Sequence, residues 1–371
     1  MKRELQNVLL LILSITISLF IIEIVVRQID NEQFVKNNLY VISDYSTFIY
    51  KPNTHFNLKR PEFITDVKIN SKGIRDYEYG YEKKENVRRI EMFGDSFIAA
   101  FQVPLEKSVS KKLEKLLSKN SGSNIQYDVL NMGLSGTGPM PQVIFLEKEG
   151  IKYDPDILIS NIYLGNDFIK VDFGISGNIP IQIFEDNDDL MNAQFGVTQI
   201  QKIKNFVFRN FFTYSYIMKI LNNLKNDESY GTDYPEVDIY KKQYTASTKE
   251  GLEKLKIILK HLKRYSDQKE IKLLIVLIPT KGQVDQEKFL EFVSKYEFDR
   301  SELELDKAQK IFLEFGKENN IKMLNLLPDF SKRNKNNTFY FEIDGHWNEK
   351  GHELAANLIY EKLINDGFIS P

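Results

Sequence analysis

Short apolar runs alternate with amphipathic segments along most of the chain after residue 86. Five short, mainly apolar runs predict buried strands: 89–93, 127–130, 157–164, 273–278 and 323–327. Four segments carry apolar residues at helical spacing: 109–117, 252–262, 305–315 and 348–363. Strands that alternate with helices predict a parallel sheet with helices on both sides. Asn348 is placed to cap the last of these helices.

The N-terminus has a different pattern, because residues 8–26 are almost entirely Leu, Ile, Val and Phe. As a helix this run would be about 28 Å long, close to the hydrocarbon thickness of a bilayer. Lys2 and Arg3 precede it, which favours a cytoplasmic N-terminus and an exported remainder. A cleavable signal peptide is the alternative, but no small-x-small cleavage site follows the run. We therefore expect residues 1–27 to be an uncleaved transmembrane signal anchor in the cell membrane.

Two further stretches lack the alternating pattern. Residues 28–86 carry scattered aromatics, prolines and charges, and we expect an extracytoplasmic extension that leads into a catalytic domain at 87–371. Residues 168–247 are too many for a bare loop in a compact domain. They predict an insertion or lid, with an acidic run and a cluster of aromatic side chains.

Composition narrows the function classes. The 371 residues include 42% hydrophobic and 27% charged residues, which is typical of a globular protein. The formal net charge is −2, so the chain as a whole carries no basic footprint for nucleic acid. There is no cysteine, which excludes disulfides, thiolate metal sites and a cysteine nucleophile.

Four short motifs follow predicted strands or precede the last predicted helix. They are Gly94-Asp95-Ser96-Phe97, Asn131-Met132-Gly133, Gly165-Asn166-Asp167 and Asp344-Gly345-His346. Together they supply a serine, a turn glycine, a side-chain amide and a histidine with a nearby carboxylate. Those groups are the parts of a serine hydrolase. Open α/β sheets place their sites just beyond the carboxyl ends of strands, where three of these motifs are expected.

The four motifs, in this order, resemble the SGNH (GDSL-type) hydrolase family over roughly residues 90–359. The signature residues of the family would here be Ser96, Gly133, Asn166 and His346. The resemblance implies a flavodoxin-like three-layer α/β/α sandwich with a parallel sheet, preceded by the transmembrane helix. Phe97 stands where the family usually has leucine, a packing position that should not change the chemistry.

Ser96 is the expected nucleophile, and a serine hydroxyl needs a base within hydrogen-bond reach. The chain has four histidines: His55, His261, His346 and His352. We expect His261 to be solvated in a charged helical segment, and His352 to be a surface or packing residue. Only His346 has a carboxylate two residues away, Asp344, which could orient its ring and stabilise the imidazolium.

The oxyanion of the tetrahedral intermediate would be held by the Ser96 and Gly133 N–H groups and the Asn166 side-chain amide. A turn glycine and a strand-end asparagine are the plainer interpretations of these two residues. We expect Asp95, Asn131 and Asp167 to brace their loops.

Trp347 is the only tryptophan. It either lines the site and stacks on a sugar, which we favour, or packs in the core. The sequence contains no metal-ligand cluster, phosphate-binding glycine loop or dinucleotide motif, so we expect no cofactor and no metal.

The predicted function is that of a serine esterase that cleaves an O-acyl ester. The resemblance implies that the acyl group is acetyl and that its carrier is a carbohydrate or a cell-surface polysaccharide. The same acyl-enzyme would serve a polysaccharide O-acetyltransferase, and a membrane acyltransferase is then a candidate partner. A non-catalytic, membrane-tethered polysaccharide-binding protein is the alternative from another class. We expect the catalytic domain to lie outside the cytoplasm.

Overall fold

The structure is a computed structural model, and the residues it describes fall into several ranges. They are 2–29, 39–42, 48–120, 125–168, 171, 238–295, 298–334 and 338–369, with 203, 207, 213, 214, 217 and 221 as single residues. The predicted insertion at 168–247 therefore lies for the most part outside the described residues. The chain forms two compact units: 1–41 with 197–233, and 42–196 with 234–371.

The first unit contains the N-terminal helix α1 (Lys2–Ile29). Its stretch Arg3–Arg27 has a mean hydropathy of 2.9 and is long and apolar enough to cross a membrane. Glu23, the one acidic residue late in the helix, pairs with Arg27 at 2.9 Å. The same carboxylate accepts hydrogen bonds of 2.8 Å from the backbone N–H and the hydroxyl of Thr213. The predicted helix is present, and by length and composition it could be a membrane anchor.

The second unit is built on a five-stranded parallel sheet. Its strands are β5 (Val87–Gly94), β6 (Gln126–Gly133), β7 (Ile157–Tyr163), β8 (Lys272–Ile278) and β9 (Lys322–Asn325). The strand order is β6-β5-β7-β8-β9, and every adjacent pair is parallel. Because the chain winds first to one side of β5 and then to the other, the switch point lies at β5, where such sheets form their sites.

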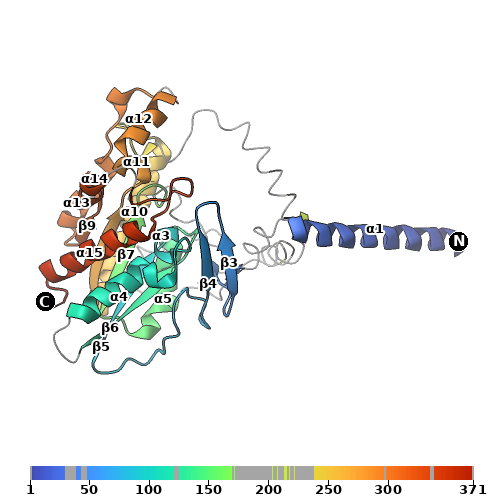
Figure 1. Cartoon of the computed structure of the whole chain (residues 1–371), viewed down its shortest axis with the longest axis horizontal. Coiled ribbons are helices and arrows are strands. Elements are labelled where there is room, and N and C mark those ends of the chain that lie inside the picture. Colours follow the sequence, from blue (N-terminus) through green and yellow to red (C-terminus); the bar gives the residue numbers. More distant parts are fainter. Residues whose placement is uncertain are drawn as a thin grey trace. The chain divides into compact units, whose positions relative to one another are not determined.

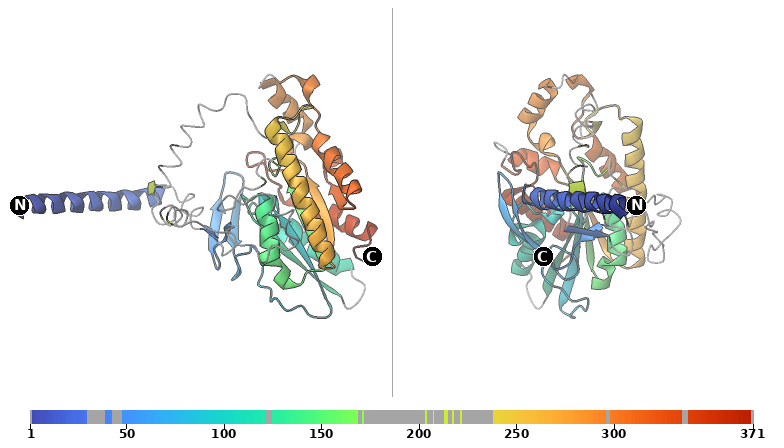
Figure 2. Two further views of the ribbon diagram at one scale, coloured as in Figure 1. Left: turned by 180° about the vertical axis from the view of Figure 1, so that it is seen from behind. Right: turned by 90° about the vertical axis from the view of Figure 1, so that its right-hand side faces the viewer.

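Helices cover both faces of this sheet (Figures 1 and 2). On one face lie α4 (Val109–Asn120) and α15 (Glu349–Asn365). On the other lie α5 (Pro139–Lys148) and α10 (Ala246–Gln268). The predicted three-layer α/β/α sandwich with a parallel sheet is confirmed.

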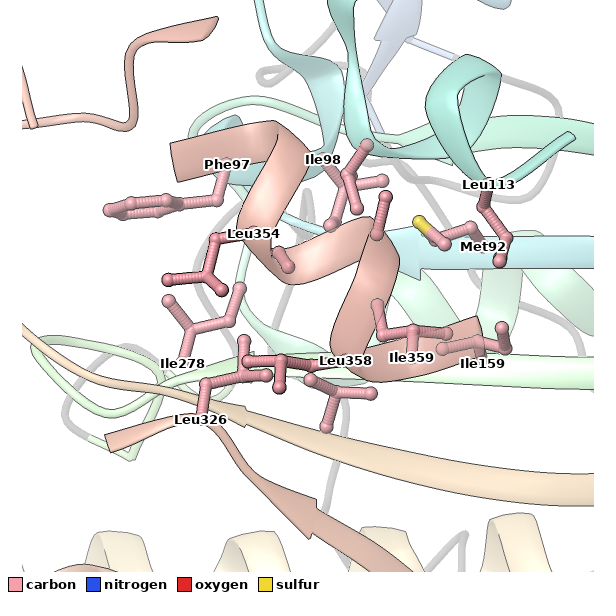
Figure 3. Packing of buried hydrophobic residues seen from close by; sticks show 14 of the residues in the cluster. Met92, Phe97, Ile98, Leu113, Ile159, Ile278, Leu326, Leu354, Leu358 and Ile359 are labelled. Atoms are coloured by element: carbon pink, nitrogen blue, oxygen red, sulfur yellow. The ribbon is translucent and has the colours of Figure 1, made fainter. Parts of the chain in front are cut away.

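Alternate residues of the central strands point into the two layers. Ile90 and Met92 of β5 join the core beneath α4 and α15, in which Leu354 and Leu358 face the sheet (Figure 3). Phe93 points to the other face and lies edge-on to Phe145 of α5, with ring centroids 6.4 Å apart. Burial on both faces explains why these strands are continuous apolar runs in the sequence.

The strands and helices predicted from the sequence are all present, with ends shifted by a few residues. Ser96 opens the short helix α3 (Ser96–Ala99). The helices that were not predicted include α5, α11 (Lys281–Val284), α12 (Gln286–Lys295) and α14 (Leu327–Arg333). The segment predicted at 305–315 is α13 (Lys307–Glu318). Three 3-10 turns occupy Leu105–Lys107, Gly150–Tyr153 and Arg300–Glu302.

The segment before the sheet contains four short strands. They are β1 (Tyr40–Ile42), β2 (Phe48–Tyr50), β3 (His55–Lys59) and β4 (Ile64–Lys68). Strands β3 and β4 form an antiparallel hairpin in which Lys59 pairs with Ile64 next to the turn. Residues 42–86 belong to the same compact unit as the sheet.

Candidate active site

Ser96, His346 and Asp344 lie in one hydrogen-bonded chain. Ser96 follows β5 directly and is the first residue of α3. Its Oγ is 2.7 Å from His346 Nε2, and His346 Nδ1 is 2.7 Å from Asp344 Oδ1. Because an ionised carboxylate can only accept, Nδ1 carries the ring proton and Nε2 is left to accept from the serine hydroxyl. This is the arrangement that a serine nucleophile and its general base require.

The loop before α15 brings the last two of these residues together. Tyr340 and Trp347 form an antiparallel bridge, and the Phe341 N–H donates to the His346 carbonyl at 2.8 Å. Gly345 stands between Asp344 and His346 with a φ of +81°, a backbone conformation that favours glycine. The tight turn lets both side chains reach the same side of the loop.

Asp344 is held in its ionised form. Partial burial acts to raise its pKa, but the hydrogen bonds that it accepts from His346 and the contact with the Gln102 side chain outweigh this, so that the pKa lies below the ordinary value of 3.8. An ionised Asp344 fixes the ring tautomer and would stabilise an imidazolium at His346.

Three further predicted residues brace the loops of the site. Asp95 accepts from the Phe97 N–H at 2.9 Å and caps α3, while its burial raises its pKa. Asp167 accepts from the Tyr163 N–H at 2.8 Å and closes the turn after β7. Asn131 accepts from the Gly133 N–H at 3.1 Å.

That last contact corrects the expectation for Gly133. Its N–H is already used by Asn131 within the buried end of β6, so in this structure it does not face a substrate. A Cβ at Gly133 would lie 2.2 Å from the backbone nitrogen of Ala99. Glycine is needed here because β6 packs directly against the backbone of α3, and not because its N–H is free.

A neighbouring glycine, which sequence reasoning passed over, fits the donor role better. Gly136 is exposed in the loop after β6 and has a φ of +77°. Among the described residues its N–H has no acceptor, whereas the Leu134 N–H in the same loop donates to the Gly94 carbonyl at 2.9 Å. That bond places the loop beside the end of β5, next to Ser96. The only sequence signal is the run of turn-forming residues at 133–139.

Asn166 lies half-buried in the turn after β7. Its backbone N–H donates to the Tyr163 carbonyl at 3.3 Å. Its side-chain amide has no hydrogen-bond partner in the part of the chain that the structure describes. It is therefore free to donate to a substrate, as is the backbone N–H of Ser96, which has no acceptor there either.

The expectation that Trp347 lines the site is wrong for this structure. Its side chain is 1% exposed and lies in the core, stacked on Phe330 at 5.4 Å and edge-on to Phe97 at 5.1 Å. His352 packs against its ring and is also buried, as one of the two expectations for that residue had it.

The expectation for His261 is also wrong. It is fully buried, and its Nε2 lies 2.5 Å from Glu147 Oε1, which comes from α5. The charged residues next to it in the sequence lie on the exposed faces of α10, whereas His261 lies on the buried face of the same helix.

The N-terminal extension holds the loops of the site in place. The buried guanidinium of Arg75 donates to the carbonyls of Ala99, Ala100 and Val103 at 2.6–2.7 Å. These carbonyls belong to the last residue of α3 and to the segment that follows it. The Asp76 carboxylate accepts a hydrogen bond from the Asn131 N–H at 2.7 Å. The Tyr50 hydroxyl, also in the extension, accepts one from the Ser135 N–H at 2.6 Å.

A cavity of about 500 Å³ lies at the opposite end of the sheet. It is bounded by residues at the amino ends of the strands, such as Arg88, Tyr127 and Lys272. Asp156 in its wall is already paired with Arg88 and Lys83. Among the described residues, no group of three or more His, Asp or Glu side chains could hold a metal ion.

Comparison with known proteins finds a match for the C-terminal third of the chain. Residues 238–368, which include Asp344 and His346, match the model of the family described as "SGNH hydrolase-like domain, acetyltransferase AlgX". Ser96, Gly136 and Asn166 lie outside the matched residues. No curated protein matches the chain.

Solved structures with a similar fold include three esterases or acylhydrolases. An acetyl xylan esterase, AlAXEase, is 14% identical with a TM-score of 0.42, covering 74% of this chain and 100% of its own. A lipase/acylhydrolase from Enterococcus faecalis is 14% identical with a TM-score of 0.40, covering 75% and 96%. A catalytic mutant of Axe2, an acetylxylan esterase from Geobacillus stearothermophilus, is 10% identical with a TM-score of 0.42, covering 75% and 94%.

The match places an SGNH hydrolase-like domain at residues 238–368, and the protein is an enzyme that acts on ester bonds, as a hydrolase or as an acyltransferase.

Proposed function

We propose that the protein is a serine esterase that cleaves an O-acetyl ester of a carbohydrate, with Ser96, His346 and Asp344 as its catalytic triad. The observation that carries the proposal is the pair of 2.7 Å contacts that link the serine hydroxyl, the imidazole and the carboxylate. The alternative of a non-catalytic polysaccharide-binding protein is less well supported, because such a protein would not need this arrangement.

In the first half of the reaction, the Ser96 hydroxyl attacks the ester carbonyl while His346 Nε2 takes its proton. The imidazolium that forms is stabilised by the ionised Asp344. The intermediate collapses when the C–O bond to the sugar breaks, and His346 returns the proton to the departing sugar oxygen. The product is an acetyl-enzyme on Ser96 and a free sugar hydroxyl.

The oxyanion of the intermediate would be held by the Ser96 N–H, the Asn166 side-chain amide and the Gly136 N–H. These donors have no competing partner among the described residues, so they need not give up a bond to bind it. One such donor typically contributes about 10²–10³ in rate.

In the second half, His346 activates the molecule that attacks the acetyl-enzyme. With water the products are acetate and free enzyme. With a sugar hydroxyl the acetyl group is transferred, and the protein is an O-acetyltransferase. This second candidate is favoured by the description of the matching family as an acetyltransferase.

The acetyl group is supported by the same family description, and carbohydrate as its carrier follows from the resemblance given above. We further propose that α1 anchors the protein in the cell membrane, with the catalytic domain on the extracytoplasmic side. Lys2 and Arg3 before the apolar run support this orientation.

The experiment that tests the proposal compares the purified full-length protein with its Ser96→Ala variant. Each is incubated with p-nitrophenyl acetate and an unacetylated oligosaccharide, and both acetate and acetylated sugar are measured by mass spectrometry. Acetate alone supports the esterase, and serine-dependent acetylated sugar supports the transferase. Equal turnover by both proteins would overturn the serine mechanism.

A further inference from the structure

The turn between β3 and β4 reaches the loop that carries Asp344. The Glu62 carboxylate accepts hydrogen bonds from three consecutive backbone N–H groups of that loop. The donors are Glu342 at 2.6 Å, Ile343 at 2.9 Å and Asp344 at 2.7 Å. Three successive N–H groups that converge on one anion form a concave site of the kind known to hold carboxylates.

The opposite edge of the loop is held by a cation. Lys281, at the start of α11, donates to the Glu342 carbonyl at 2.7 Å and lies 3.2 Å from the Glu342 carboxylate. The loop backbone therefore has a negative group on its N–H side and a positive group on its carbonyl side, which matches the direction of its peptide dipoles.

Apolar burial contributes little to holding the tip of this loop. The Ile343 side chain is 74% exposed, and Gly345 has no side chain. The main apolar contact is at the base, where Phe63 and Phe341 have ring centroids 5.0 Å apart. The position of Asp344 thus depends on its hydrogen bonds, and Glu62 supplies the one to its own backbone N–H.

We propose that Glu62 is a positioning residue of the catalytic triad: it fixes the backbone of Asp344, and through Asp344 the ring of His346, in the reactive orientation. This inference rests on the proposed function of the triad. Through Glu62 it also gives a part in the reaction to the β3–β4 hairpin, which lies outside the residues that match the family.

The physical basis is the sensitivity of general-base catalysis to geometry. A displacement of about 1 Å in a catalytic group can lower the rate by about a hundredfold. Glu62→Gln keeps the shape of the side chain but replaces one of its two acceptor oxygens with an NH₂ group that would face backbone N–H donors. We expect kcat to fall by about ten- to a hundredfold, with KM unchanged within about twofold because Glu62 does not touch the substrate.

The chain offers a matched control in Glu78. Its carboxylate also accepts two hydrogen bonds from the extension, from the N–H and the hydroxyl of Ser71 at 2.7 and 2.8 Å. None of its bonds reaches the loop of Asp344. Glu78→Gln makes the same chemical change in the same region, and we expect its kcat to match that of the unmodified protein.

A double-mutant cycle distinguishes positioning from a general loss of structure. Glu62→Gln is measured alone and in the Asp344→Asn background, in the full-length protein with p-nitrophenyl acetate. If Glu62 acts through Asp344, its effect on kcat falls to less than about threefold once Asp344 has been replaced. Unfolding followed by the fluorescence of Trp347 checks that each variant is folded.

Two results would overturn the inference: an unchanged kcat in Glu62→Gln, or an equal fold-loss with and without the Asp344 carboxylate. Ser96→Ala is measured in the same series. If that variant keeps its activity, the proposed function fails, whereas an inactive Ser96→Ala beside a fully active Glu62→Gln rejects only the role of Glu62.

Discussion

Two of the histidine–carboxylate pairs among the described residues have similar contacts and different surroundings. His346 and Asp344 are 2.7 Å apart in a loop, with side chains 25% and 21% exposed. His261 and Glu147 are 2.5 Å apart between α10 and α5, and both side chains are 0% exposed. The first pair continues to the Ser96 hydroxyl, while the second lies in the layer that packs α5 and α10 on the sheet.

The difference shows that the pair itself does not define a catalytic site. A general base must reach both the nucleophile and the substrate, so part of its ring has to be accessible. A buried pair exchanges no proton with a substrate, and its contribution is to satisfy two polar groups that folding has removed from water. The four predictions below follow this contrast, from the largest expected effect to the smallest.

Replacing the base of the exposed pair should have the largest effect. In His346→Ala, nothing takes the proton of Ser96, and we expect kcat/KM for p-nitrophenyl acetate to fall by at least about a thousandfold. His261→Ala should keep the activity per folded molecule. The ratio of the two rates, each corrected for the folded fraction, is the measurement. Comparable losses in both variants would contradict the assignment of roles.

Breaking the buried pair should instead affect stability. Glu147→Met removes the carboxylate partner of a buried histidine, and we expect the free energy of unfolding to fall by about 3–5 kcal/mol. Adding His261→Leu makes the site apolar on both sides and should recover most of this loss. Denaturant unfolding monitored by Trp347 fluorescence measures both variants. A double variant no more stable than the single one would show that the pair is not energetically coupled.

The sequence allowed the exposed pair to be predicted and not the buried one. Asp344 and His346 are two residues apart, so one turn brings them together and the spacing is visible in the chain. Glu147 and His261 are 114 residues apart and meet only because α5 and α10 pack on the same face of the sheet. Local charge around His261 suggested solvent, since sequence alone does not show which polar residue faces the sheet.

The same distinction holds for the fold and the rest of the site. The run 273–278 predicted β8 because burial on both faces demands apolar residues at every position. From the sequence we named Gly133 as the oxyanion donor and passed over Gly136, because the difference between them depends on the approach of α3 to β6. The three contacts of Glu62 join residues about 280 positions apart, and no local pattern marks them.

His352 gives a third case, a buried histidine packed against Trp347 at 5.5 Å. Burial, with smaller contributions from nearby cations, lowers its pKa from 6.5 to about 3. Because the unfolded chain then binds more protons than the folded one between these values, stability falls as the pH drops below 6.5. At pH 4 we expect this residue to account for about 3 kcal/mol of lost stability.

His352→Leu should remove that part of the acid sensitivity. The measurement is the free energy of unfolding at pH 7 and pH 4, followed by circular dichroism in both proteins. We expect the difference between the two pH values to be smaller in the variant. The same loss in the variant and the unmodified protein would show that other groups cause it.

The smallest effect should be the contribution of the exposed pair to stability. In Asp344→Asn we expect the free energy of unfolding at pH 7 to fall by less than about 1 kcal/mol, because partly exposed ion pairs are screened by solvent. The pKa of Asp344 is lowered, so its contribution to stability is present above pH 3.8 and is lost as the pH falls through the lower pKa of the folded state.

The kcat of the same variant should nevertheless fall by about 10²–10⁴, since the histidine loses the partner that fixes its tautomer. Unfolding and turnover measured on one preparation make the test, and a stability loss as large as that of Glu147→Met would mean that Asp344 holds the fold together as much as it serves the reaction.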